Sequence, residues 1–176
     1  MKAAIRRTYG SFDAISIEEI KNPIPKEDEI LIRVKATTVN RTDCANLTGK
    51  PFIMKMMLGY PKPRKIIIGT DFAGEVLETG KNITSFKSGD RVFSFLDMGL
   101  ESQAEFVCVK ENSLLKMPEN IDFKQAAASL EGAHYAYSFI HYVDVKSGNK
   151  ILINGATGAI GSALLQFARL FDVELT

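Results

Sequence analysis

The sequence has few of the residues that mark disulfide scaffolds, nucleic-acid-binding proteins or membrane proteins. Its only two cysteines in 176 residues, Cys44 and Cys108, form no CxxC pair, which favours reduced thiols and a cytoplasmic location. The formal net charge is only +1, so there is no electrostatic case for binding nucleic acid. No apolar run is long enough to span a membrane, and the N-terminal segment lacks the apolar core of a signal peptide. We expect a cytoplasmic globular protein with neither nucleic acid nor membrane as a partner.

The composition is that of an ordinary globular protein, with 45% hydrophobic and 24% charged residues, enough for one domain and part of a second. The first two thirds contain short strand-like segments separated by glycine and proline, a pattern typical of a small barrel or sandwich. In the segment 30–38, Ile30, Ile32 and Val34 alternate with polar residues, so one face is apolar. Strands are predicted at residues 14–20, 30–38, 71–79, 91–95, 104–109 and 114–117.

The pattern changes near Asp122, a suitable N-cap for a helix over residues 123–130, and a second helical stretch runs to about residue 143. A buried-type strand is predicted at 150–154 and an amphipathic helix at 159–171, with an apolar stripe through Ile160, Leu164 and Phe167. Residues 173–176 resemble the start of another strand. The last part of the chain therefore predicts an unfinished βαβ unit.

A glycine-rich turn, NGATGAIG at residues 154–161, connects that strand to that helix. Its last six residues match the GxGxxG dinucleotide fingerprint with alanine in the first place, and the predicted cofactor-binding residues are Ala156, Thr157, Gly158, Ala159, Ile160 and Gly161. Gly158 would let a pyrophosphate approach the backbone, and Gly161 would let the helix pack on the strand. The alternative is a turn that is glycine-rich only for packing. The carboxylate that would bind the ribose 2′-OH is expected about 20 residues further on, at or beyond the C-terminus, so the turn does not distinguish NADH from NADPH.

Five stretches occur in a fixed order: GTDFAG at 69–74, KSGDRVF at 87–93, AEFV at 104–107, QAAA at 125–128, and the glycine turn. Together they resemble the medium-chain dehydrogenase/reductase superfamily, most closely its zinc-free quinone oxidoreductase (zeta-crystallin-like) branch. The resemblance covers essentially the whole chain, but only about the first half of such an enzyme. It implies a mixed β and α/β fold: a GroES-like β-barrel over residues 1–121 that carries the substrate side, then the first βα unit of a truncated Rossmann domain over residues 122–176. The implied cofactor is NADPH or NADH, with NADPH favoured.

Zinc alcohol dehydrogenases of this superfamily carry Cys near position 40 and His-Glu at positions 70 and 71. Here those positions are Asn40, Thr70 and Asp71, and the four-cysteine structural lobe is missing. A catalytic zinc needs three protein ligands, and the only histidines, His134 and His141, are seven residues apart, too distant to hold one ion without help. We therefore predict no tightly bound zinc, and a zinc alcohol dehydrogenase is the less favoured alternative.

In the zinc-free branch, hydride passes from the nicotinamide to an enone or quinone, and hydrogen-bond donors meet the charge that develops on the substrate oxygen. The resemblance makes Asn40, Thr42 and Asp43 the candidate catalytic residues. Asn40 would bond the nicotinamide ribose or the substrate, Thr42 would donate or relay a proton, and Asp43 would orient the turn. The alternative, which is compatible with these roles, is that residues 40–43 cap a short helix. His134 stands where relatives usually have Thr, so it either bonds the cofactor or is a neutral replacement on a helix.

Two functions remain open at this point. The first is a zinc-independent, NAD(P)H-dependent oxidoreductase that reduces a small apolar quinone or α,β-unsaturated carbonyl. The second is a catalytically inactive truncated fragment or interaction module, because most of the nucleotide-binding sheet is absent. The unpaired edge of the strand at 150–154 also predicts either self-association into a homo-oligomer or disorder of the last residues. The methionine-rich segment 50–65 is either a wall of the substrate cleft or a loop or short helix packed on the barrel.

Overall fold

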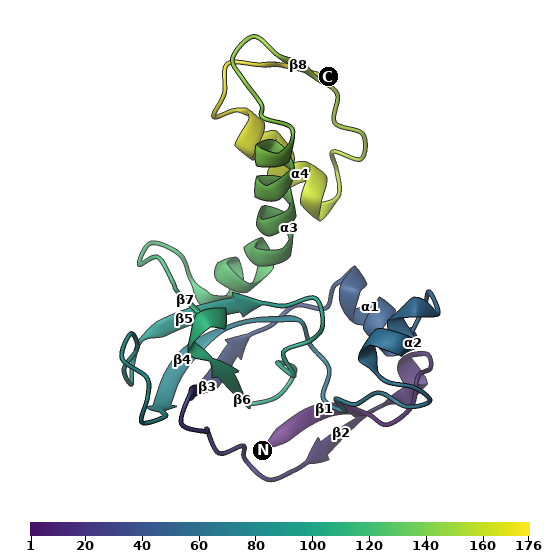
Figure 1. Cartoon of the computed structure of the whole chain (residues 1–176), viewed down its shortest axis with the longest axis vertical. Helices are drawn as coiled ribbons and strands as arrows, with labels where there is room; N and C mark the ends of the chain where they lie inside the picture. Colours follow the sequence, from purple (N-terminus) through teal and green to yellow (C-terminus); the bar gives the residue numbers. More distant parts are fainter. The chain divides into compact units, whose positions relative to one another are not determined.

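The computed structural model describes all residues from 1 to 176 and groups them into two compact units, residues 1–127 and 128–176. The first unit is built mainly of strands and the second mainly of helices (Figure 1). The division falls within the long helix α3 (Phe123–Tyr142), shortly after the domain boundary that the sequence predicts at residues 121 and 122. Each unit is described by itself.

A five-stranded antiparallel sheet in the order β6-β3-β4-β5-β7 is the framework of the first unit. Its long central strands pair from Ile30 with Thr79 to Ala36 with Ala73, and two register shifts interrupt the ladder. Such shifts bend a strand and increase its twist. The strands are β3 (Glu29–Ala36), β4 (Asp71–Thr79), β5 (Arg91–Phe95), β6 (Phe106–Lys110) and β7 (Leu115–Lys116). All five were predicted, with β6 and β7 starting one or two residues later than expected.

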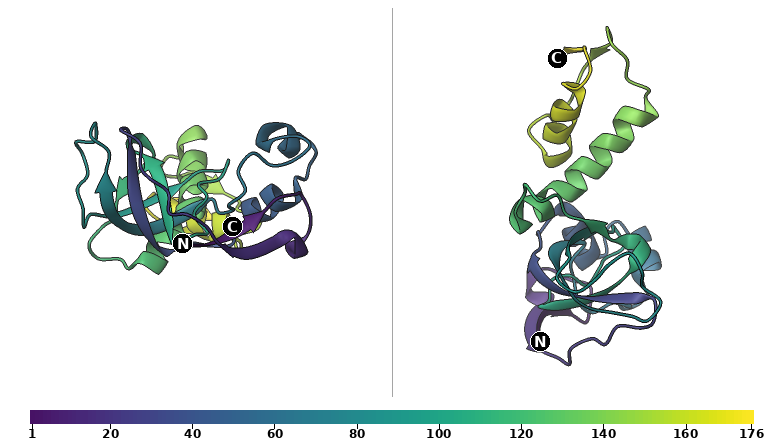
Figure 2. Two further views of the ribbon diagram at one scale, coloured as in Figure 1. Left: turned by 90° about the horizontal axis from the view of Figure 1, so that it is seen from below. Right: turned by 90° about the vertical axis from the view of Figure 1, so that its left-hand side faces the viewer.

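A second antiparallel pair, β1 (Lys2–Arg6) and β2 (Ile15–Glu19), lies beside the five-stranded sheet, with a 3-10 turn η1 (Phe12–Ala14) between its strands. Isolated bridges from Ala3 to Ala104 and from Ile5 to Ile67 connect β1 to the rest of the unit. The strands of the first unit therefore curve around a common interior (Figure 2). This arrangement confirms the barrel-like prediction.

The core of the first unit follows from the period-two alternation of its strands. Ile30 and Ile32 of β3 and Phe72 and Val76 of β4 face one interior and are fully or almost fully buried. Ala73 of β4 faces the other way. It belongs to a second buried cluster that includes Met117, Ala126 and Ala127. The first turns of α3 therefore cover the face of β4 that the barrel interior does not.

Two short helices lie between β3 and β4: α1 (Arg41–Thr48) and α2 (Ile53–Leu58). α1 ends at Gly49, whose φ of +61° is a left-handed conformation that glycine adopts without steric cost. A 3-10 turn, η2 (Glu111–Ser113), connects β6 to β7. From the sequence, α1 and α2 are expected only as the structural alternatives for residues 40–43 and 50–65, and those alternatives are correct.

In the second unit, β8 (Lys150–Ile151) pairs in parallel with β9 (Glu174–Leu175), and α4 (Ala159–Ala168) connects them. The predicted βαβ arrangement is confirmed, with shorter elements. The strand predicted at 150–154 ends at Ile151, and the helix predicted to reach Phe171 ends at Ala168. The two helical stretches predicted over 123–143 are one continuous helix, because Gly132 does not interrupt α3.

Candidate functional site

Asn40 is the N-cap of α1, and its side chain is held by a reciprocal capping box. Its Oδ1 accepts a hydrogen bond from the Asp43 backbone N–H at 2.9 Å, and the Asp43 carboxylate accepts one from the Asn40 backbone N–H at 3.1 Å. The helix-capping alternative for residues 40–43 is therefore what the structure shows. The capping box also fixes the direction of the Asn40 amide group, and a fixed amide group can still take part in chemistry.

The amide nitrogen of Asn40 reaches across to the beginning of β4. Its Nδ2 donates to Thr70 Oγ1 at 2.8 Å and to Asp71 Oδ2 at 3.1 Å. Thr70 and Asp71 are both almost completely buried. Asn40, Thr70 and Asp71 are the three positions at which the resemblance expects Cys, His and Glu in zinc alcohol dehydrogenases. The structure thus brings these three sequence positions together, and a network of neutral donors and one carboxylate connects them.

Asp71 is a buried carboxylate surrounded by donors. The Thr38 backbone N–H donates to its Oδ1 at 2.7 Å, and the Thr38 hydroxyl donates to its Oδ2. The Thr37 hydroxyl donates to its backbone carbonyl at 2.7 Å. Because burying a charge without hydrogen bonds is costly, these bonds explain how Asp71 is tolerated inside the unit. They also lock the chain between β3 and α1 against β4.

Thr42 and Asp43 lie on the first turn of α1, directly after Asn40. Asp43 is buried and takes part in the capping box, which agrees with the orienting role predicted for it. Gln103 lies nearby, and its Nε2 donates to the Thr38 carbonyl at 3.2 Å. Thr42 is half-buried, as Asn40 is, and its predicted part in proton transfer stays a prediction.

Sequence reasoning missed Thr38 and Gln103 and used Asp71 only as evidence against zinc. The sequence around Asp71 does not signal that it is buried, because Asp is mostly exposed in proteins and is almost never fully buried unless it is paired. Thr38 and Gln103 gave no local signal either. Their proximity depends on pairing between segments 30–70 residues apart in sequence, which no local pattern records.

No group of three or more His, Cys, Asp or Glu side chains in the structure has a geometry that could hold a metal ion. His134 and His141 both lie on exposed positions of α3. The predicted independence from zinc stays a prediction that a metal analysis must test.

The glycine turn leads into α4, whose N-cap is Gly158 and whose start carries no side-chain cap. A Cβ on Gly161 would lie 2.2 Å from the Gly155 carbonyl oxygen, whereas a Cβ on Gly158 would have only that oxygen nearby, at 3.5 Å. Gly161 therefore allows a close approach within the turn itself rather than to the strand. A Cβ on Gly158 would instead make only an ordinary van der Waals contact. The first backbone N–H groups of a helix have no intrahelical partner, so this end offers donors to an anion.

His134 projects from an exposed position of α3, and its ring meets the Tyr135 ring edge-on with centroids 5.4 Å apart. The glycine of the same helix, Gly132, lies against the start of α4, since a Cβ there would be 2.8 Å from the Ala159 carbonyl oxygen. His134 therefore belongs to the helix that packs beside the glycine turn. Its predicted contact with a cofactor is untested.

The methionine-rich segment forms α2, which exposes Phe52, Ile53, Met56 and Met57. The short-helix interpretation of this segment is thus correct, and the exposed apolar surface leaves a substrate-wall role open. None of the helices combines the length and hydropathy required to cross a lipid bilayer.

The strand framework and the Asn40 cluster define a GroES-like domain of the alcohol dehydrogenase type, and comparison with known proteins agrees. Residues 26–119 match the family model "Alcohol dehydrogenase GroES-like domain". The human quinone oxidoreductase is 35% identical over 177 aligned residues, which cover 99% of this chain and 51% of that protein. The chloroplastic NADPH-dependent alkenal/one oxidoreductase of Arabidopsis thaliana is 32% identical, with 96% of this chain and 44% of that protein covered.

Among solved structures, the quinone oxidoreductase from Coxiella burnetii superposes with a TM-score of 0.88 at 26% identity, covering 99% of this chain and 55% of that one. The chain spans about half the length of the curated relatives it matches. It belongs to the alcohol dehydrogenase GroES-like domain family and, within the medium-chain dehydrogenase/reductase superfamily, to the quinone oxidoreductase branch.

Proposed function

We propose that this chain supplies the substrate-side barrel and the first nucleotide-binding turn of a zinc-independent, NADPH-dependent reductase. The substrate would be a quinone or an α,β-unsaturated carbonyl. The observation that carries the proposal is the Asn40–Thr70–Asp71 network, in which hydrogen-bonded Asn40 and Thr70 side chains stand where the resemblance places the Cys and His of zinc alcohol dehydrogenases. Two relatives named above, a quinone oxidoreductase and an NADPH-dependent alkenal/one oxidoreductase, support the substrate class.

The residues of the glycine turn fit a dinucleotide. The turn follows a parallel strand, opens a helix without a side-chain cap, and has room for a Cβ at Gly158. The helix-start N–H groups and the helix dipole favour a phosphate by about 0.3–1 kcal/mol. NADPH bound there would supply the hydride. NADPH is preferred to NADH on the resemblance and on the name of the plant relative.

The chain's own residues would bind and orient the substrate and supply a proton. Both amide hydrogens of Asn40 are already donated, to Thr70 and to Asp71. A direct bond from Asn40 to ribose or substrate would therefore replace one of these, and we assign Asn40 first to positioning the α1 start. The Thr42 hydroxyl, on the first turn of α1, would then donate to the substrate oxygen as negative charge develops on it. Asp43 holds the turn through the capping box.

Cofactor binding can be tested directly by titrating the 176-residue chain with NADPH and following the nucleotide's fluorescence. Gly158→Ala would place a methyl group where a phosphate must approach, at a position whose backbone tolerates alanine. We expect it to fold and to bind NADPH about tenfold more weakly, which corresponds to about 1.4 kcal/mol. Gln166→Ala, on the exposed side of α4, is the matched control and should bind like the unmodified chain.

Turnover is measured as NADPH oxidation in the presence of 1,4-benzoquinone or but-3-en-2-one. Thr42→Val should lower kcat, whereas Thr48→Val, whose hydroxyl donates to the Cys44 carbonyl on the same helix, should not. Chelation and metal analysis test zinc independence in the same samples. Saturable NADPH binding without turnover would favour the non-catalytic alternative, and the absence of NADPH binding would refute the cofactor assignment for this chain.

A further inference from the structure

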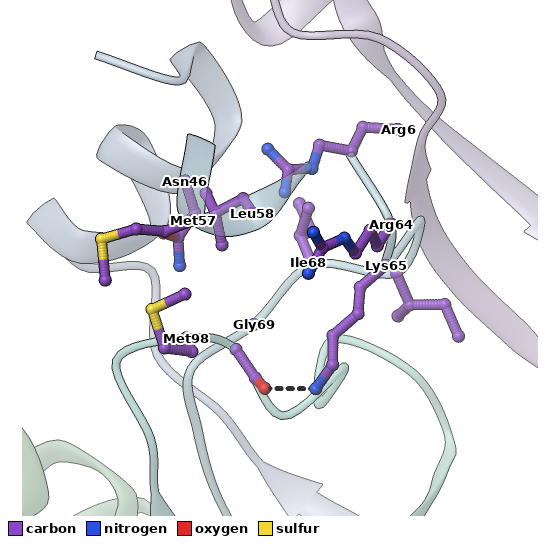
Figure 3. Close-up of a pocket in the computed structure, with 11 residues that line it drawn as sticks. Arg6, Asn46, Met57, Leu58, Arg64, Lys65, Ile68, Gly69 and Met98 are labelled. Atoms are coloured by element: carbon purple, nitrogen blue, oxygen red, sulfur yellow. Dashed lines mark hydrogen bonds between the residues drawn. The ribbon is translucent and has the colours of Figure 1, made fainter. Parts of the chain in front are cut away.

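A cavity of about 180 Å³ lies in the first unit, and none of the residues of the Asn40 network lines it. It is enclosed by β1, α1, α2 and the segments that precede β4 and follow β5 (Figure 3). At about 30 Å³ per water in the liquid, it has room for a small molecule or a few waters. Its polar lining comes mainly from Arg6, Asn46, Arg64 and Lys65.

Arg6 is the unusual feature of this cavity. Its side chain extends from β1 and is only 3% exposed, and its Nε and Nη1 atoms have no hydrogen-bond partner. No ion pair of the structure involves Arg6; the closest compensating contact is with the Tyr9 ring, 5.3 Å from the guanidinium carbon. Burial lowers the pKa of Arg6. A buried guanidinium without a carboxylate leaves the cost of removing a charge from water largely uncompensated.

Two further cations line the same cavity. Arg64 is exposed on one side and takes part in none of the ion pairs. The positive charge of Lys65 is compensated better than that of Arg64, because the Lys65 Nζ donates to the Gly99 carbonyl at 2.7 Å and lies 3.9 Å from the Glu101 carboxylate. No acidic side chain lines the cavity. The field inside it is therefore positive, as an anion requires.

Asn46 requires a hydrogen-bond donor, whereas Arg6 requires an acceptor. Its Nδ2 donates to the Asp97 carbonyl at 3.0 Å, which leaves Oδ1 buried and without a donor. A bare oxyanion would satisfy Arg6 and leave Asn46 Oδ1 unpaired. A molecule that carries both an anionic oxygen and a hydroxyl group would satisfy both residues, and its carbon skeleton would lie against Met57, Leu58 and Met98.

We propose that this cavity is a binding site for a small hydroxylated oxyanion, a phosphate monoester or a hydroxycarboxylate with a short carbon chain. Arg6 and Arg64 bind the anionic group, and Asn46 accepts a hydrogen bond from the hydroxyl. Figure 3 shows the labelled side chains of this site, with the guanidinium end of Arg6 directed toward the side where Leu58 lies. The site is independent of hydride transfer, because it shares no residue with the Asn40 network or the glycine turn.

The test is the thermal stability of the 176-residue chain in glycerol 3-phosphate, lactate, inorganic phosphate and sodium chloride at matched ionic strength. A ligand at about ten times its Kd should raise the melting temperature by about 3 °C. We expect the rise with glycerol 3-phosphate or lactate, a smaller one with inorganic phosphate, and none with sodium chloride. The larger of the first two responses identifies the anionic group.

Arg6→Met removes the buried charge but keeps an unbranched chain of similar length. It should be at least as stable as the unmodified chain without ligand, and it should lose the response to glycerol 3-phosphate and lactate. Arg64→Gln should reduce that response, and Arg169→Gln, an exposed arginine of the second unit, should leave it unchanged. If Arg6→Met does not fold, the test compares the ligand-induced rise in melting temperature of Arg64→Gln with that of Arg169→Gln, and only Arg64→Gln should show a reduced rise. No response in the unmodified chain, or an equal response in the pocket variants, would overturn the proposal.

Discussion

Asn40 has two structural roles, capping α1 and donating hydrogen bonds to Thr70 and Asp71, and the substitution Asn40→Ala removes both. Losing an N-cap costs about 1 kcal/mol. The same change also removes both amide donors from Thr70 and Asp71, which are 0% and 1% exposed. Thr70 Oγ1 then loses this donor, whereas Asp71 keeps the two donors of Thr38, and leaving one buried acceptor without its donor costs about 1–3 kcal/mol. We therefore expect Asn40→Ala to lower the free energy of unfolding by about 2–4 kcal/mol.

Asp122→Ala provides the matched control. Asp122 closes the same kind of reciprocal box at the start of α3, where its Oδ1 accepts from the Gln125 N–H at 2.7 Å, but its side chain is exposed. It should cost only about 1 kcal/mol. Asn40→Ser keeps a capping oxygen while removing the amide donors, so its cost should lie between the two. Guanidinium unfolding followed by circular dichroism gives the three values. Equal costs for Asn40→Ala and Asp122→Ala would refute the buried network as a source of stability.

Four other predictions concern separate parts of the chain. Phe72→Ala should cost about 3–5 kcal/mol in chemical denaturation, because Phe72 is fully buried in the barrel core. Gly161→Ala should destabilise the glycine turn and expose its amides to hydrogen exchange, whereas Gly158→Ala should not. Burial raises the pKa of Cys108 to about 11, so at pH 8 about one thiol in a thousand is ionised. A disulfide reagent should modify the exposed Cys44 first, and the rate at which it modifies Cys108 should increase as pH rises. Sedimentation velocity should show concentration-dependent self-association, and a monomer at all concentrations would refute it.

The strands were predictable where one face is buried and the other is not. In β3, Ile30 and Ile32 are buried while Arg33 and Lys35 are exposed, so the period-two pattern was visible in the sequence. The ends of elements were less predictable. Ile153 donates to the Thr176 carbonyl at 3.0 Å beyond the assigned end of β8. The apolar run therefore continues past the regular ladder, and sequence alone cannot show where the ladder stops.

Of the candidate site, the sequence identified Asn40, Thr42 and Asp43, which are close to one another along the chain. It did not identify Thr38 as a partner of Asp71, because that contact depends on how β3 and β4 pair. Arg6 was missed altogether. On β1 it follows an alternating pattern in which a basic residue is expected to face solvent, and only the packing of α2 and the segment before β4 encloses it.

By itself, the sequence determined the strand-rich first part, the βαβ pattern around the glycine turn, and the identity of Asn40, Thr70 and Asp71 at the positions compared with zinc alcohol dehydrogenases. These features are local or lie in a fixed order, so residue types and spacing carry them. The tertiary structure decided which side chains meet: that Asn40 donates both amide hydrogens to β4, and that Arg6 is buried without a counter-charge. Hydrogen bonding and burial depend on contacts between distant segments, and those exist only once the chain has folded.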